Sequence, residues 1–274
     1  MMKTSKRLFL SMVVAILSFG SLFGTAGADT LKIEGSTTVL PIAQKAAEAF
    51  MKANPGVNVS VSGGGSGNGI KAIVDGTIDV ATSSRFIKDK EIANAVKNNI
   101  YPVPFAVAYD CIVPVVHPSN PVNDLTIDQL KGIYEGKIRN WKEVGGDDLQ
   151  IVVISRDTSS GTYEIWEEKV LQGSRVSPAA MLQASSGAVV QAVSKNRYAI
   201  AYVGLSYLNK DVKATKVNGV EASLETAAAF PVSRPLFMFT KGWPTGTTLQ
   251  FMNFLLHPRK GQQIVSEAGY IPLY

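Results

Sequence analysis

The sequence predicts an α/β fold divided into two lobes, with a ligand cleft between them. Strand-like apolar runs alternate with helical patterns along most of the chain, which favours mixed sheets flanked by helices. Two long apolar runs, near residues 101–116 and 234–240, are typical of a chain that crosses to a second lobe and later returns. We therefore expect one lobe to comprise residues 29–105 and 235–274, and the other to comprise residues 106–234.

Residues 1–28 have the layout of a secretory signal peptide. A charged start with Lys3, Lys6 and Arg7 precedes an apolar run, and a small-residue cleavage site ends at Ala28. Retention of this segment as a membrane anchor is the alternative interpretation. Cleavage after Ala28 would release a periplasmic protein.

The charge balance argues against a nucleic-acid partner. The chain has 27 Lys and Arg against 22 Asp and Glu, a formal charge of +5. Because the first 28 residues hold three of these cations and no acidic residue, the rest has 24 cations against 22 acids, a charge of +2. Without a block of like charges, we expect no basic surface of the kind that binds nucleic acids.

The first lobe alternates strands and helices. Strands are predicted at residues 31–34, 57–61 and 78–81, and helices at residues 41–52, 69–74 and 88–97. In the first helix, Ile42, Ala46, Ala47 and Phe50 follow the helical period and form one apolar face.

The second lobe continues the alternation less regularly. Helices are predicted at residues 127–134, 162–171 and 189–194, and strands at 149–154 and 199–203. Two C-terminal helices, at residues 247–256 and 260–267, are predicted in the part of the chain that returns to the first lobe. Pro114 is expected to interrupt the first long apolar run. Cys111, in the same run, is expected to be a buried inert thiol, and a lone cysteine excludes an intramolecular disulfide.

Three loops between a strand and a helix are rich in small hydroxyl residues and glycine. They are Gly35-Ser36-Thr37-Thr38, Gly65-Ser66-Gly67 and the segment Arg156–Thr162. Such loops offer free N–H groups at a helix N-terminus, hydroxyl donors and room for close approach, which is the chemistry of an anion site. Arg156 adds a planar fork that suits two oxygens of one tetrahedral anion. Helix caps and flexible surface loops are the alternative interpretation.

The candidate ligand residues come from these loops and from the end of a fourth strand. They are Ser36, Thr37, Thr38, Ser66, Gly67, Ser84, Arg156, Asp157, Ser160, Gly161 and Thr162. Arg85, directly after Ser84, either binds the anion or pairs with a carboxylate at the rim, and we favour the second, supporting role.

The motifs of common enzymes are missing from the sequence. It contains no G-x-S-x-G elbow and no P-loop, and its two histidines, His117 and His257, each precede a proline. No metal-ligand spacing is present, so we expect a binding protein without a metal or cofactor rather than a phosphatase or hydrolase. A binding fold recruited for adhesion or signalling is a further alternative.

These loops resemble those of the PstS-like substrate-binding proteins, the periplasmic phosphate-binding proteins of phosphate ABC transporters. Further matching segments are Ile78–Arg85, Leu125–Trp141 with Gly145-Gly146, and Gly269–Leu273. The resemblance therefore spans nearly the whole chain after residue 28.

The resemblance implies a type II periplasmic-binding-protein fold that closes on inorganic phosphate and delivers it to a membrane permease, acting as a monomer. By position it implicates Thr37, Thr38, Ser66, Arg156, Ser160, Gly161 and Thr162. Where some members place an aspartate that accepts the proton of phosphate, this chain has Ser84, and Asp157 is a candidate substitute. Sulfate, molybdate or tungstate is the alternative ligand.

Overall fold

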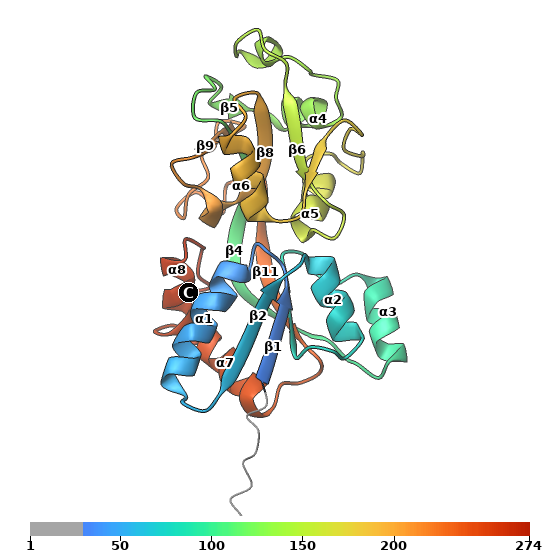
Figure 1. Ribbon diagram of the computed structural model, residues 1–274, viewed down its shortest axis with the longest axis vertical. Helices are drawn as coiled ribbons and strands as arrows, with labels where there is room; N and C mark the ends of the chain where they lie inside the picture. Colours follow the sequence, from blue (N-terminus) through green and yellow to red (C-terminus); the bar gives the residue numbers. More distant parts are fainter. Residues whose placement is uncertain (1–29) are drawn as a thin grey trace, which may run out of the picture.

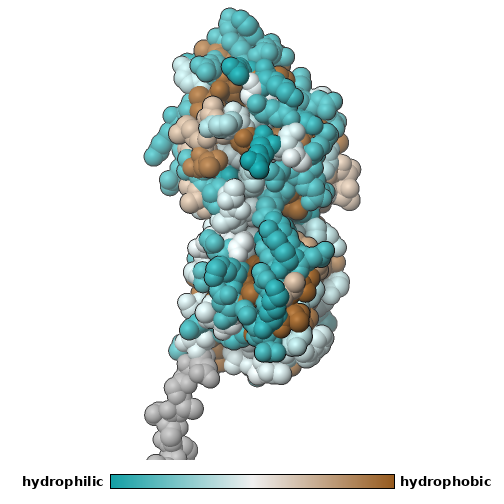
Figure 2. Space-filling model, turned by 90° about the vertical axis from the view of Figure 1, so that its right-hand side faces the viewer, coloured by the Kyte–Doolittle hydropathy of each residue, from teal (hydrophilic) through white to brown (hydrophobic). Residues whose placement is uncertain are grey.

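The computed structural model describes residues 30–274, and the predicted signal peptide lies outside them. Figure 1 shows two lobes joined by two long strands, β4 (Val103–Val116) and β11 (Ser233–Thr240). We use lobe 1 for residues 30–105 with 235–274, and lobe 2 for residues 106–234. The space-filling view shows a waist between the lobes (Figure 2). The boundaries of the lobes stay a prediction, because β4 and β11 both run through this waist.

Nine strands of residues 30–274 form one continuous mixed sheet, in the order β2-β1-β3-β11-β4-β8-β6-β7 with β9 on β4. Two short strands, residues 124–125 and 216–217, form a separate pair. The other main strands of the large sheet are β1 (Thr30–Gly35), β2 (Asn58–Gly63), β3 (Val80–Ser83), β6 (Val152–Arg156), β7 (Met181–Gln183) and β8 (Ala199–Gly204). Within each lobe the pairs β1–β2, β1–β3, β6–β7 and β6–β8 are parallel, and β11 is antiparallel to β3 and β4. The predicted mixed α/β fold is confirmed.

β4 makes the sheet continuous across the waist. Its residues from Val103 to Cys111 pair with β11, and those from Ile112 to Val116 pair with β8. The predicted interruption at Pro114 is wrong. Proline lacks an N–H but keeps its carbonyl, which accepts a hydrogen bond from Thr215 N at 3.0 Å.

Eight helices among residues 30–274 cover the sheet. They are α1 (Leu40–Ala53), α2 (Ser66–Val74), α3 (Asp89–Lys97), α4 (Ile127–Tyr134), α5 (Gly161–Lys169), α6 (Ser186–Ser194), α7 (Gly246–Leu256) and α8 (Gly261–Glu267). All were predicted, but α2 and α6 each begin three residues earlier than expected. Gly65, with φ of +99°, turns the chain into α2, and Ser185 Oγ caps α6 by accepting from Ala188 N at 3.1 Å.

Other boundaries shift in the opposite direction. β3 ends at Ser83 and β6 at Arg156, each two residues later than predicted, so Arg156 is the last residue of a strand. Several short elements were not predicted, because they are too short to show a period: β5 (Asp124–Leu125), β7, β9 (Lys213–Ala214), β10 (Lys216–Val217) and the 3-10 helices η1 (Trp141–Val144) and η2 (Leu205–Tyr207). No helix of the described residues has the length and hydropathy needed to span a membrane.

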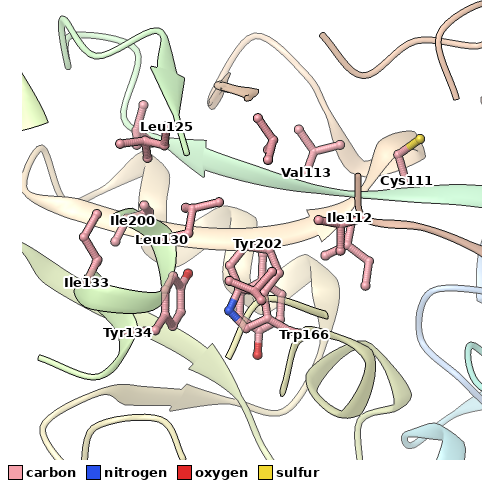
Figure 3. Close-up of a cluster of buried hydrophobic side chains, with 14 of the residues drawn as sticks. Cys111, Ile112, Val113, Leu125, Leu130, Ile133, Tyr134, Trp166, Ile200 and Tyr202 are labelled. Atoms are coloured by element: carbon pink, nitrogen blue, oxygen red, sulfur yellow. The ribbon is translucent and has the colours of Figure 1, made fainter. Parts of the chain in front are cut away.

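Separate buried clusters lie on the two sides of the waist. In lobe 2, Trp166 stacks on Tyr202 with ring centroids 4.3 Å apart, and Tyr134 meets Trp166 at 5.1 Å (Figure 3). In lobe 1, Phe50 packs edge-to-face on Phe251 at 5.4 Å. Each side therefore has its own apolar core, and most of the apolar packing lies within a lobe rather than between the lobes.

Cys111 is fully buried at the lobe 2 end of the waist, as predicted. Burial raises the pKa of its thiol to about 12, so the reactive thiolate is absent at neutral pH.

Candidate functional site

A cluster of buried hydroxyl groups and two arginines lies where the lobes meet. Each of its members is at most 7% exposed: Thr37, Thr38, Ser66, Ser84, Arg156, Ser160, Thr162, Ser186 and Arg234. The helices α1, α2, α5 and α6 all begin at this cluster. The N-terminal turns and the positive ends of four helix dipoles therefore meet there, which favours an anion.

The hydroxyl groups of the loop before α1 have two roles: one stabilises the loop, and the others contact lobe 2. Ser36 Oγ accepts hydrogen bonds from two N–H groups of its own loop, at 3.1 and 3.3 Å, and so stabilises the turn. Thr38 Oγ1 lies 2.9 Å from Thr162 Oγ1, and Thr37 Oγ1 lies 3.4 Å from Ser186 Oγ. Thr37 and Thr38 therefore face lobe 2, whereas Ser36 bonds within its own loop.

Ser66 and Ser84 form a pair on the lobe 1 side of the cluster. Ser84 N donates to Ser66 Oγ at 3.0 Å, and the two hydroxyls lie 3.2 Å apart. Ser84 Oγ also lies 3.5 Å from Thr162 Oγ1 in lobe 2. The N–H of Gly67 is engaged elsewhere, because it donates to the carbonyl of Ser159 at 2.9 Å.

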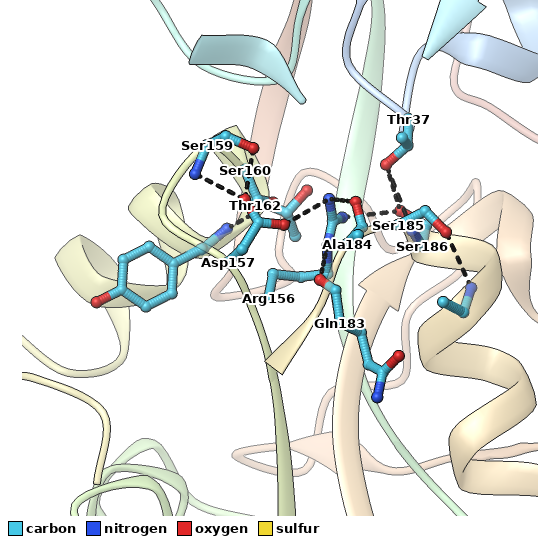
Figure 4. A network of polar contacts seen from close by, with 12 residues as sticks. Thr37, Arg156, Asp157, Ser159, Ser160, Thr162, Gln183, Ala184, Ser185 and Ser186 are labelled. Carbon is cyan, nitrogen blue, oxygen red and sulfur yellow. Dashed lines mark hydrogen bonds and ion pairs between the residues drawn. The ribbon is translucent and has the colours of Figure 1, made fainter. Parts of the chain in front are cut away.

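Arg156 is held in a fixed orientation at the end of β6 (Figure 4). Its Nε donates to the carbonyl of Gln183 and its Nη2 to the carbonyl of Ala184, both at 3.0 Å. Nη1 reaches Ser186 Oγ at 3.3 Å. Burial lowers the pKa of Arg156, yet a guanidinium stays charged at neutral pH. The carbonyls thus fix the plane of the fork before any ligand arrives.

The start of α5 lies directly against lobe 1. Ser160 Oγ accepts from Tyr163 N at 3.3 Å and caps the helix. A Cβ added to Gly161 would lie 2.6 Å from Ser66 Oγ and 2.9 Å from Ser84 Oγ. The glycine therefore allows an approach between the lobes that any side chain would obstruct.

Asp157 stabilises its own loop. Its Oδ1 accepts from Ser159 N at 2.8 Å and from the Ser159 hydroxyl, while its Oδ2 is 4.0 Å from Arg156 Nη2. Ser159 Oγ in turn lies 3.5 Å from the carbonyl of Gly64 in lobe 1. The carboxylate is thus engaged by neighbouring donors.

Arg85 points to the rim of the cluster, as the supporting role predicted. Its Nη2 is 2.7 Å from Glu91 Oε1, and its Nε is 2.8 Å from Glu164 Oε2 on α5. Lys88 Nζ is 2.5 Å from the same Glu164 oxygen. Burial opposes the charge of Arg85, but Glu91 and Glu164 together raise its pKa. Glu164 therefore links two cations of lobe 1 to lobe 2.

The predicted ligand residues fall into two groups. Brought together at the cluster are Thr37, Thr38, Ser66, Ser84, Arg156, Ser160, Gly161 and Thr162. The polar groups of Ser36, Gly67 and Asp157 make hydrogen bonds to their own or the facing loop. For all of them, contact with a ligand stays a prediction.

Two residues of the cluster, Ser186 and Arg234, and Asp110, the ion-pair partner of Arg234, were not identified from the sequence. Ser186 follows Ser185 and precedes Gly187, a small-residue pattern like that of the other loops, but the helix was predicted to begin too late. Arg234 and Asp110 lie within long apolar runs, where isolated charges are themselves a signal of burial with a partner.

The described part of the chain offers no set of side chains that could coordinate a metal ion. Among residues 30–274, no three His, Cys, Asp or Glu side chains converge in a group that could hold a metal ion. The cluster instead consists of hydroxyls, N–H groups and guanidinium groups.

Comparison with known proteins identifies relatives over nearly the whole chain. The model of the PBP superfamily domain matches residues 24–259. The phosphate-binding protein PstS of Bacillus subtilis is 31% identical over 291 aligned positions, covering 99% of this chain and 95% of that protein. The protein SphX of Synechococcus elongatus is 31% identical over 88% of this chain and 76% of its own length.

Solved structures agree with these relatives. A protein of Clostridium perfringens, described as a phosphate ABC transporter substrate-binding protein with bound phosphate, superposes with a TM-score of 0.84. It is 36% identical, and the match covers 90% of this chain and all of that one. An ABC-type phosphate transport receptor of Vibrio cholerae has a TM-score of 0.72 and 32% identity over 88% of this chain and 99% of its own.

Proposed function

Because the chain belongs to the PstS-like phosphate-binding proteins of the PBP superfamily, we propose that it binds inorganic phosphate outside the cytoplasmic membrane. It then delivers the anion to the permease of an ABC transporter when the lobes open. The observation that carries the proposal is the cluster of donors divided between two lobes, with Thr38 and Thr162 hydroxyls only 2.9 Å apart. One chain supplies every residue of this cluster, which supports the proposal that the protein acts as a monomer.

In this proposal each lobe supplies part of the ligand shell. Lobe 1 contributes hydroxyls and N–H groups around Thr38, Ser66 and Ser84, and lobe 2 contributes Arg156 and the first turn of α5. Closure completes the shell and excludes water, so binding and closure are one event. Nothing in this scheme requires catalysis.

Magnitudes support a site that relies on hydrogen-bond donors rather than net charge. A micromolar dissociation constant corresponds to about 8 kcal/mol. Hydrogen bonds to a charged group contribute about 1.5–3 kcal/mol each, so six to ten of them exceed this requirement. The surplus offsets dehydration of the anion and ordering of the lobes. One arginine with hydroxyls and N–H groups is therefore sufficient.

Selectivity must come from hydroxyl groups rather than a carboxylate. By its resemblance to the family, this chain has Ser84 where some members place an aspartate. Asp157 bonds to Ser159, and Asp110 bonds to Arg234. Hydroxyls can donate a hydrogen bond to an oxyanion and can also accept one from its P–OH group, so Ser84 and its neighbours tolerate either protonation state of phosphate. We therefore expect weaker discrimination against sulfate than an aspartate would give.

Competition between oxyanions tests the proposed function. Isothermal calorimetry on the protein without residues 1–28 should show tight phosphate binding across pH 5–9. Sulfate, molybdate and tungstate should displace phosphate only at concentrations at least about tenfold higher, a difference of about 1.4 kcal/mol. Tighter binding of any of the other three anions would contradict the assignment of phosphate as the ligand.

Replacing Glu164 by glutamine is expected to weaken phosphate binding about 2- to 10-fold at low salt. The change removes the ion pairs of Glu164 with Arg85 and Lys88 across the cleft, and partly exposed pairs contribute about 0.2–1 kcal/mol each. Salt screens such pairs, so the difference from the unaltered protein should shrink at roughly 0.5 M salt. Glu168→Gln, an exposed change on the same helix, is the control. An equal loss of phosphate affinity at both salt concentrations would show that the ion pairs of Glu164 with Arg85 and Lys88 do not stabilise the closed state.

A further inference from the structure

A buried ion pair at the waist has no role in the function proposed above. Arg234 of β11 lies directly opposite Asp110 of β4 in the strand register. Arg234 Nη2 is 2.9 Å and its Nε 3.3 Å from Asp110 Oδ2, and the residues are 3% and 0% exposed. Taking two charges out of water is costly, and an apolar pair would join the strands at least as well. The pair therefore calls for an explanation beyond strand pairing.

The other hydrogen bonds of the pair lead to the ligand loops. Arg234 Nη1 donates to the carbonyl of Ser84 at 3.2 Å, and its Nη2 lies 3.5 Å from Thr38 Oγ1. Asp110 Oδ1 accepts from Leu205 N at 2.9 Å, in the segment after β8. The pair thus connects two loops of lobe 1 with lobe 2, at the strands that join the lobes.

Hydrogen-bond polarity gives Arg234 a specific effect on Thr38. A guanidinium can only donate, so Thr38 Oγ1 accepts from it, and the O–H of Thr38 is left to donate to Thr162 Oγ1 or to a ligand. The hydroxyl of Tyr270 donates to the carbonyl of Thr38 at 2.5 Å, which fixes the backbone of the same residue. Thr38 is therefore held as a directed donor, the polarity that a bound anion requires.

We infer that Arg234, held by Asp110, is a positioning residue that orients Thr38 and Ser84 toward bound phosphate. The inference rests on the proposed function, because the oriented donors have a purpose only if an anion binds among them. Asp110 compensates the charge of Arg234, so the pair orients donors without adding net charge. Arg156 thereby remains the cation that attracts the ligand.

A double variant, Arg234→Gln with Asp110→Asn, tests the inference directly. Removing both charges together leaves no unpaired charge buried, so the variant should fold and unfold cooperatively. Its phosphate affinity, measured by calorimetry, should fall about 10- to 100-fold, because an oriented bond to a charged ligand is lost. A folded double variant with unchanged affinity would overturn the inference.

A double-mutant cycle that combines Arg234→Lys with Thr38→Val distinguishes a positioning role of Arg234 from a general structural role. Arg234→Lys keeps a cation beside Asp110 but lacks the fork that reaches two loops. It should weaken phosphate binding about 10-fold in the unaltered protein and less than about 2-fold in the Thr38→Val background, because contacting residues are not additive. Equal losses in both backgrounds would show that Arg234 does not act through Thr38.

Binding of phosphate to the unaltered protein is measured first, which keeps the two conclusions apart. If that protein does not bind phosphate, the proposed function fails, and this inference fails with it. If it binds and the losses in the cycle are additive, the inference alone fails.

Discussion

Replacing Arg156 by alanine is expected to lower phosphate affinity about 100- to 10,000-fold. The fork of Arg156 is held by the carbonyls of Gln183 and Ala184, and it is 1% exposed, so water cannot replace it. Two charge-assisted hydrogen bonds to the anion, at about 1.5–3 kcal/mol each, account for the predicted loss. Calorimetry with phosphate measures the affinity, and thermal unfolding verifies that the variant is folded.

Two further substitutions test whether the loss in the Arg156→Ala variant is specific to the guanidinium fork and to this position. Arg156→Lys keeps the charge but not the planar fork, so its affinity should fall between those of the alanine variant and the unaltered protein. Arg197→Ala removes an exposed arginine of the same lobe and should leave binding unchanged. A folded Arg156→Ala protein with undiminished affinity would show that the site lies elsewhere.

The fold was predictable where elements are long and strongly periodic. The helix at residues 127–134 was predicted with the bounds that the structure shows, because its N-cap Thr126 and apolar period agree. Pro114 misled the reasoning, since a proline ends a strand only where its missing N–H is needed. Short strands such as β5 and β9, with two residues each, form through tertiary pairing and leave no local pattern.

The candidate site was predictable where it follows a local rule. Hydroxyl and glycine residues at helix starts identified Thr38, Ser66 and the Arg156 segment, because helix N-termini need such residues whether or not a ligand binds. The division of tasks among them was not predictable. Ser36 stabilises its own turn and Thr38 contacts Thr162 of the other lobe, and these roles depend on what the folded chain places near each hydroxyl.

Residues that act through distant partners were missed for a different reason. Arg234 and Asp110 are 124 positions apart and become neighbours only through the pairing of β11 with β4. A single sequence without an alignment gives no direct sign of that pairing. A charge inside an apolar run nevertheless predicts a buried partner, and each of these two runs contains one.

Replacing Gly161 by alanine is expected to lower phosphate affinity about 5- to 100-fold while leaving the protein stable. The added Cβ would lie 2.6 Å from Ser66 Oγ and 2.9 Å from Ser84 Oγ, so full closure becomes strained by about 1–3 kcal/mol. Within lobe 2 the change is harmless, because alanine favours the first turn of α5 over glycine. Calorimetry should therefore show weaker phosphate binding, whereas thermal unfolding of the variant should occur at the same temperature as in the unaltered protein or higher.

Gly187→Ala is the matched control, because it lies in the first turn of α6 and its Cβ would meet no atom within 4 Å. Its affinity should equal that of the unaltered protein. Small-angle scattering adds a direct readout, since phosphate should compact the control protein but compact the Gly161→Ala protein less. If Gly161→Ala bound phosphate with full affinity and compacted fully, the contact between α5 and lobe 1 would not belong to the bound state. A loss of both affinity and compaction would assign the weakened binding to closure of the lobes. A defect confined to the ligand contacts would lower the affinity, but the Gly161→Ala protein would still compact fully at saturating phosphate.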